Sequence, residues 1–186
     1  MDITEYAQEV IRELDRALKA ISPQEAERLA DLVLAANRIF VAGAGRSGLA
    51  MRAFAMRLMH MGFTAYVVGE TVTPAVKADD LLVIGSGSGA TATLVAIADK
   101  AKTLGASLAL VTIFPGSRIG QLADAVVRIP ASTPKADGDA QFASVQPMGS
   151  LFEQSLLIVL DIVVMRLMEK KAFDSNTMFE RHANLE

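Results

Sequence analysis

Apolar residues recur at helical spacing near the start of the chain, and further along they gather into short runs separated by glycine and polar turns. In residues 3–21, isoleucine, valine and leucine return every three or four positions, which predicts an amphipathic helix. A second helix is expected directly afterwards, because Ser22 fits an N-cap, Pro23 the first helical position and Glu25 the third, as in a capping box.

Five apolar runs follow and predict five strands. They read RIFVAGAG, TAYVV, DLLVIGSGSG, SLALVTIF and AVVRIPA. Helices are expected between them over residues 47–61 and 91–104, each stopped by a glycine, and a short helical piece is expected after the turn that begins at Pro115. Continuous apolar strands that alternate with helices predict an α/β fold whose parallel sheet is covered on both faces, with right-handed crossovers.

The chain of 186 residues is long enough for one domain with a hydrophobic core. We divide it into N-terminal helices (1–36), an α/β core (37–130), a loop rich in Ser, Pro, Gly and Asp (131–149) and a C-terminal helix with its tail (150–186). The long helix, over residues 150–171, is apolar on nearly every side, so part of it is expected to pack against another subunit.

Composition excludes several classes of protein. Apolar residues make up 52% of the chain and charged residues 21%, which excludes a disordered or fibrous protein. The net charge of -3 is spread over mixed signs and gives no basic run for nucleic acid. The start lacks a signal-peptide pattern, and the most apolar segment, 156–168, is too short for a bilayer, which takes about 20 residues. The chain has no cysteine, and a cytoplasmic location is expected.

The first glycine loop, Gly43–Gly48, lies between a predicted strand and a predicted helix. It matches the dinucleotide pattern G-x-G-x-x-G, and Glu70 follows near the position of a ribose-binding carboxylate. Against this, the chain has no obvious second domain to hold a hydride acceptor. The glycines could also serve only a tight strand-to-helix turn, so both hypotheses stay open.

The second glycine loop, Gly85–Gly89, is followed by Thr91 and again joins a strand to a helix. Glycines let the backbone approach an anion, the helix dipole attracts it, and Ser and Thr hydroxyls add donors for the oxygens of a phosphomonoester. The Lys of a nucleotide triphosphate loop is lacking, and Gly87 stands where a serine hydrolase carries its nucleophile. We interpret the loop as a phosphate site rather than an ordinary Ser/Gly turn.

Three side chains are candidates for acid–base chemistry. Glu153 follows Ser150 in an S-x-x-E pattern, which favours a capping box, although the same carboxylate could be the base of a proton transfer beside the phosphate site. His60 would end a helix, and His182 lies in a polar tail. These two histidines are far apart in sequence and no cysteine joins them, so no metal site is predicted.

Several segments together resemble the 6-phospho-3-hexuloisomerases, within the larger group of sugar isomerase (SIS) domains. The similar segments are VAGAGRSG, MRLMHMGF, VVGE, IGSGSGAT, QPMGSLFEQ and the ending HANLE, so the similarity runs nearly from end to end. The Ser/Gly loop is shared by SIS domains generally, whereas QPMGSLFEQ and HANLE are narrower.

The resemblance implies a three-layer αβα sandwich of flavodoxin-like type with a five-stranded parallel sheet, assembled into tetramers with shared active sites. It implies the interconversion of D-arabino-hex-3-ulose 6-phosphate and D-fructose 6-phosphate through a 2,3-enediolate, without cofactor or metal. The reaction belongs to the ribulose monophosphate route of formaldehyde fixation, after 3-hexulose-6-phosphate synthase. Two further hypotheses stay open: another SIS-type aldose–ketose isomerase, and a sugar-phosphate-binding module without turnover.

The resemblance also implies roles for individual residues. The phosphate would be held by Ser47, Ser86, Ser88 and Thr91, with the amides of Gly87 and Gly89. Glu153 would be the base, and His60 and His182 would polarise the carbonyl or pass protons, from the same or a neighbouring subunit. Gly45 and Arg46 are possible substrate contacts.

Overall fold

The computed structural model describes residues 1–132 and 142–185, so part of the predicted loop 131–149 lies outside the described residues. The helices are α1 (Ile3–Lys19), α2 (Pro23–Ala35), α3 (Gly45–His60), α4 (Ala92–Thr103), α5 (Ser150–Lys171) and α6 (Ser175–Phe179). The strands are β1 (Ile39–Gly43), β2 (Ala65–Val67), β3 (Leu81–Gly85), β4 (Ser107–Thr112) and β5 (Ala125–Arg128). The five predicted strands are confirmed. The short helix predicted after Pro115 is wrong, because the chain there forms a series of turns.

All five strands are parallel and lie in the order β2-β1-β3-β4-β5. Successive side chains of a strand point to opposite faces of the sheet, and both faces are apolar. In β1, for example, Ile39 and Val41 belong to the cluster shared with α2, α3 and α5, whereas Phe40 and Ala42 belong to the cluster around α4. The alternation explains why the strands read as continuous apolar runs in the sequence.

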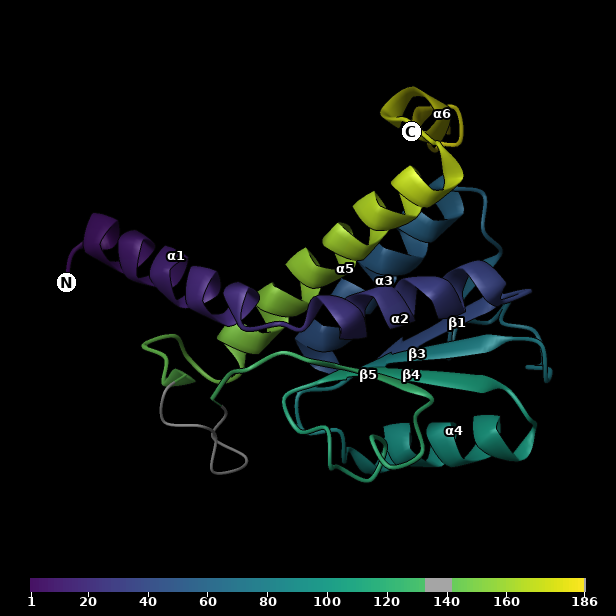
Figure 1. Cartoon of the computed structure of the whole chain (residues 1–186), viewed down its shortest axis with the longest axis horizontal. Helices are drawn as coiled ribbons and strands as arrows, with labels where there is room; N and C mark the ends of the chain where they lie inside the picture. The colour runs from purple at the N-terminus through teal and green to yellow at the C-terminus, as the bar shows by residue number, and fades with distance from the viewer. Residues whose placement is uncertain (133–141, 186) are drawn as a thin grey trace.

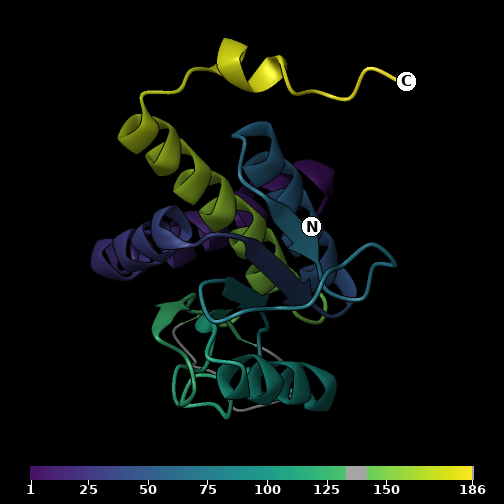
Figure 2. The ribbon, with the colours of Figure 1, turned by 90° about the vertical axis from the view of Figure 1, so that its right-hand side faces the viewer.

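The helices cover the two faces of the sheet unequally. Figure 1 shows α2, α3 and α5 on one side of the strands, and Figure 2 shows α4 by itself on the other. α1 packs against α5 rather than on the sheet, and its first turns extend beyond the body of the molecule. The predicted three-layer αβα arrangement is therefore confirmed, with an additional helix attached to the outside of one layer.

Local signals explain how α2 begins and how it is fixed to the sheet. Ser22 is the N-cap, as predicted, and its hydroxyl accepts a hydrogen bond from the amide of Glu25. The Glu25 carboxylate does not complete the capping box. It accepts a hydrogen bond from the Arg128 amide at 2.8 Å instead, which joins the start of α2 to β5.

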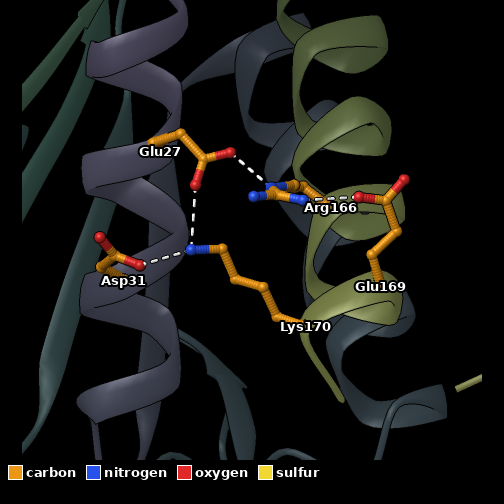
Figure 3. Close-up of polar contacts among 5 residues, drawn as sticks. All are labelled: Glu27, Asp31, Arg166, Glu169 and Lys170. Carbon is orange, nitrogen blue, oxygen red and sulfur yellow. Dashed lines mark hydrogen bonds and ion pairs between the residues drawn. The ribbon is translucent and has the colours of Figure 1, made fainter. Parts of the chain in front are cut away.

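A charged network joins α2 to the outer side of α5 (Figure 3). Arg166 Nε lies 2.5 Å from Glu27 Oε1, and Lys170 Nζ lies 2.9 Å from Glu27 Oε2 and 2.8 Å from Asp31 Oδ1. Exposed ion pairs contribute little individually, but a network of this kind fixes how two neighbouring helices lie against each other. Within the described residues, α5 and the other helices are too short or too polar to cross a membrane.

Candidate active site

A cavity of about 250 Å³ opens beyond the carboxyl ends of β1 and β3. The strand order reverses direction at these two strands, and parallel sheets of this kind bind their ligands at such a switch point. Residues that follow β1, residues that follow β3 and the start of α5 line the cavity together. The predicted site residues that it brings together are Gly45, Arg46, Ser47, Ser86, Gly87, Ser88, Thr91 and Glu153.

The glycines of the first loop serve the close packing of α3 against β1. A side chain at Gly48 would come within 2.7 Å of the carbonyl oxygen of Gly43, so glycine lets the helix start this close to the strand. Glu70, considered as a ribose carboxylate, forms an ion pair with Arg52 on α3 instead. This arrangement supports the tight-turn hypothesis for the loop over the dinucleotide hypothesis.

Two helices begin at the cavity. α3 starts at Gly45, close to Ser47, and α4 starts after its N-cap Thr91. Among the described residues the Thr91 hydroxyl makes no capping hydrogen bond, so it remains available to a ligand in the cavity that it lines. The first N–H groups of both helices, together with the two helix dipoles, give the cavity a positive potential suited to an anion such as phosphate.

Hydrogen bonds inside the second loop fix its two serines. Ser86 Oγ accepts a hydrogen bond from the Gly89 amide at 3.2 Å, and Ser88 Oγ accepts one from the Ala90 amide at 3.3 Å. Each hydroxyl therefore keeps its own proton to donate to an anion. A side chain at Gly89 would lie 2.0 Å from Ser117 Oγ. Gly89 thus shapes the loop, and the predicted donation of its amide to phosphate would require its bond to Ser86 to break.

The capping box predicted at the start of α5 is wrong. Gly149 is the N-cap and Ser150 is the first helical residue, so the helix starts one position earlier than the S-x-x-E pattern requires. The carbonyl of Gly149 accepts a hydrogen bond from the Glu153 amide at 3.0 Å, as an N-cap carbonyl does. The Glu153 carboxylate therefore has no capping role and lines the cavity.

Arg46 and Glu153 meet at the cavity. Arg46 Nε lies 2.7 Å from Glu153 Oε2, and the Glu153 side chain is mostly buried whereas that of Arg46 is mostly exposed. Among the described residues this oxygen has no partner with hydrogen-bond geometry, so the contact is an ion pair that a ligand can rearrange. A carboxylate beside an anion-binding loop, with an exposed cation next to it, can perform a proton transfer on a phosphorylated substrate.

The two histidines lie together at a different place. The rings of His60 and His182 stack with their centroids 5.5 Å apart, and both line a second cavity with Arg57. His60 is the last residue of α3, whereas Ser47 is in its first turn, and the rise of the helix separates them by about 20 Å. Within one chain the histidines therefore lie far from the cavity that contains the phosphate loop.

Burial lowers the pKa of His60 below its ordinary value, and the charges of Arg57 and His182 lower it further. His60 is thus neutral at neutral pH, and a neutral imidazole can both donate and accept a hydrogen bond. As for metal ions, residues 1–132 and 142–185 contain no group of three His, Asp or Glu side chains placed to hold one.

The first cavity has an apolar part that no sequence pattern indicated. Ile113, Met148 and Phe152 line it, and Met148 has a left-handed backbone with φ of 58°. Ile113 and Phe152 look like ordinary core residues in the sequence. Met148 lies in the segment QPMGSLFEQ, which was singled out only by its resemblance to a family, so no local pattern marked the residue itself.

Strand order and the position of the cavity define a doubly wound α/β protein of the flavodoxin-like type. Residues 32–158 match the family model of the SIS domain. The chain is 53% identical to the 3-hexulose-6-phosphate isomerase of Bacillus subtilis (strain 168), with 100% of both chains covered. It is 44% identical to the protein of the same name from Mycobacterium gastri, with 100% of this chain and 92% of that one covered.

A solved structure agrees with these relatives. The crystal structure of a hypothetical protein from Methanococcus jannaschii, described as inferring a function of 3-hexulose-6-phosphate isomerase, matches with a TM-score of 0.83 and 34% identity. The match covers 98% of this chain and 99% of that one. The chain therefore belongs to the SIS domain family and, within it, to the family of the 3-hexulose-6-phosphate isomerases.

Proposed function

We propose that this chain interconverts D-arabino-hex-3-ulose 6-phosphate and D-fructose 6-phosphate through an enediolate that spans C2 and C3. The observation that carries the proposal is the cavity in which the Glu153 carboxylate lies beside two helix N-termini and a Ser/Gly loop. The relatives from Bacillus subtilis and Mycobacterium gastri, which match the chain over its whole length, carry the name of this activity.

The phosphate of the substrate lies among the hydroxyls that line the cavity after β1 and β3. These hydroxyls belong to Ser47, Ser86, Ser88 and Thr91. The Gly87 amide and the first amides of α3 and α4 add further donors. A phosphate fixed in this way holds the sugar carbons in one position relative to the catalytic carboxylate, which removes much of the entropic cost of the reaction.

Glu153 transfers the proton that moves between the two carbons. It takes the proton from C2 of the hex-3-ulose, the C3 carbonyl becomes the enediolate oxygen, and the same carboxylic acid returns the proton to C3. A proton passes from O2 to O3, and the C2 carbonyl of fructose 6-phosphate results. Arg46, which pairs with Glu153, would stabilise the negative oxygen of the enediolate. C2 is oxidised as C3 is reduced, so the scheme requires no external electron acceptor.

The active enzyme is a homo-oligomer, and the resemblance to the family implies a tetramer. Exposed apolar side chains on two helices support this part of the proposal: Leu157, Ile162 and Met165 on α5, and Ile3 and Ile11 on α1. Burial of these side chains against a second copy would remove apolar surface from water.

Sites shared between subunits would give the histidines a role. In one chain, the length of α3 places His60 about 20 Å from the phosphate loop, and His182 stacks on His60. If either one polarises the carbonyl or passes a proton, it reaches the site from a neighbouring subunit.

The same function places the chain in the cytoplasm, in the ribulose monophosphate route of formaldehyde fixation. Its substrate there would come from 3-hexulose-6-phosphate synthase. The support for this part is the name of the activity that its full-length relatives carry.

The activity is tested by supplying the purified protein with hex-3-ulose 6-phosphate. Fructose 6-phosphate is detected through phosphoglucose isomerase and glucose-6-phosphate dehydrogenase. We expect turnover by the protein and its loss in Glu153→Gln. Conversion of arabinose 5-phosphate or ribose 5-phosphate in place of the hexulose would instead indicate an aldose–ketose isomerase. Binding of fructose 6-phosphate without turnover of any of these sugars would indicate a sugar-phosphate-binding module.

A further inference from the structure

A buried carboxylate lies outside the cavity and has no part in the proposed chemistry. Glu13, on α1, is only 2% exposed. Its Oε2 accepts hydrogen bonds from Ser144 Oγ at 2.6 Å and from Gln146 Nε2 at 2.9 Å, and its Oε1 accepts one from the Val145 amide at 2.7 Å. A buried charge is tolerated only when it is well satisfied, and three donors from one short segment satisfy this one.

Arg16 lies one turn further along α1 and holds the same segment. Its guanidinium donates a hydrogen bond to the carbonyl of Ala143 at 2.9 Å and lies over the ring of Phe142, 5.8 Å from the centroid. Glu13 and Arg16 are three residues apart, so their side chains lie on the same face of the helix. Together they fix residues 142–146 by contacts to five consecutive positions.

The pKa of Glu13 agrees with this geometry. Burial raises it, but the hydrogen bonds from Ser144, Gln146 and Val145 and the charge of Arg16 outweigh burial and leave the pKa below its ordinary value. Glu13 is therefore a carboxylate at neutral pH, with its oxygens available as acceptors to the segment.

The segment that Glu13 holds leads directly into the proposed active site. Met148 and Gly149 line the cavity, and Glu153 follows in the first turns of α5. Met148 has φ of 58°, a left-handed conformation that is strained for a residue with a side chain and persists only where the surroundings impose it. On one side of Met148 the chain is fixed by α5, and on the other side it is fixed by Glu13 and Arg16.

We propose that Glu13 is a positioning residue of the isomerase site, which acts through the 142–146 segment on Met148, Gly149 and the start of α5. The proposal rests on the function proposed above. It gives α1, which packs against α5, a role in catalysis: the helix holds the part of the cavity that carries the base in its working position. The phosphate loop lies on the sheet and does not depend on this contact.

The variant Glu13→Gln tests the proposal, because it keeps the size of the side chain and replaces an acceptor oxygen by an NH2 group facing donors. A catalytic carboxylate displaced by a fraction of an ångström loses rate, so we expect kcat to fall about tenfold or more. The phosphate loop is untouched, and KM is expected to stay within about threefold. Glu9→Gln is the matched control, since Glu9 lies one turn earlier on α1 and pairs with Arg12 at the surface.

All variants are assayed with hex-3-ulose 6-phosphate well below their melting temperatures. A purely structural role would lower the melting temperature of Glu13→Gln and leave its kcat unchanged at the assay temperature. This result would overturn the proposal. If Glu13→Gln does not fold, the variant Ser144→Ala is used instead. It removes the donor of one of the three hydrogen bonds to Glu13 and leaves the carboxylate in place. A fall in its kcat at constant KM would support the proposal, and an unchanged kcat would overturn it. Lack of turnover by the unmodified protein would refute the proposed function instead.

Discussion

The hydroxyl of Thr91 in the cavity is available to a ligand because the helix that Thr91 begins does not use it. Thr91 is the N-cap of α4, but its hydroxyl makes no capping bond among the described residues. Thr103, at the other end of the same helix, donates to the carbonyl of Asp99 at 2.8 Å. The two threonines therefore form a matched pair, with one available to a ligand and one used by the helix.

Thr91→Val removes one donor to the phosphate. A hydrogen bond to a charged group contributes about 1.5–3 kcal/mol, so kcat/KM for the sugar phosphate is expected to fall roughly 10- to 100-fold without loss of thermal stability. Thr103→Val is the control and is expected to retain kcat/KM. Equal kcat/KM values for Thr91→Val and Thr103→Val would contradict the proposal that Thr91 binds the phosphate.

Glu153→Gln separates catalysis from stability. Gly149 caps α5, so removal of the carboxylate costs no capping bond. We expect the melting temperature to change by no more than about 2 °C, while kcat falls by about 100-fold or more, as is usual for loss of a general base. The control is Glu169→Gln on the exposed side of the same helix. Full kcat in Glu153→Gln would exclude Glu153 as the base.

At the scale of elements, a buried ion pair holds β1 and β3 together at the ends away from the cavity. Asp80, directly before β3, accepts hydrogen bonds from Arg38 at 2.9 and 2.6 Å and from the Lys77 amide at 2.6 Å. Burial raises the pKa of Asp80, but the hydrogen bonds and charges of Arg38 and Lys77 lower it by more. The net pKa lies below the ordinary value for an aspartate.

This lowered pKa gives the pH dependence a definite sign. Asp80 stabilises the folded state above its unfolded pKa of about 3.9, and the stabilisation is lost as the pH falls through the lower folded value. Asp80→Asn is expected to reduce the free energy of unfolding at pH 7 by about 3 kcal/mol, and the deficit is expected to shrink in acid. Urea unfolding at pH 7 and at acidic pH measures the difference in unfolding free energy between Asp80→Asn and the unmodified protein. A difference that stays constant in acid would contradict the lowered pKa of Asp80. The kcat of the folded variant should match that of the unmodified protein.

Most elements could be predicted from the sequence because their signals are local. The apolar runs, the Ser22 cap and the glycines after α3 and α4 gave the strands and helices within a few residues. The cap of α5 could not be predicted, because Gly149 and Ser150 compete for one position and the outcome depends on the backbone. The five-residue helix α6 is too short to show a periodicity.

The position of the site could be predicted from the sequence, whereas the long-range contacts around it could not. Both glycine loops follow parallel strands, so their residues had to meet at one edge of the sheet. The contact of Glu13 with residues 144–146 joins positions more than a hundred residues apart, and no pattern in either segment predicts this contact. The distance between His60 and the phosphate loop likewise became clear only once the course of α3 was known.

At the scale of the whole molecule, a mixing experiment tests whether subunits share sites. Glu153→Gln and His60→Asn are each expected to be nearly inactive. If a site takes its carboxylate from one subunit and its histidine from another, co-refolding of the two variants in equal amounts restores about a quarter of the sites. Activity no higher than that of the separate variants would contradict shared sites that use His60, and light scattering would report the oligomer independently.

The most direct measurement is proton NMR of fructose 6-phosphate incubated with the protein in heavy water. A 2,3-enediolate exchanges the proton on C3, so deuterium is expected at C3 together with the appearance of hex-3-ulose 6-phosphate. Glu153→Gln should show neither. Deuterium at C1 would indicate an aldose–ketose isomerase, and that result, or an unlabelled sugar with no hexulose formed, would contradict the proposed reaction.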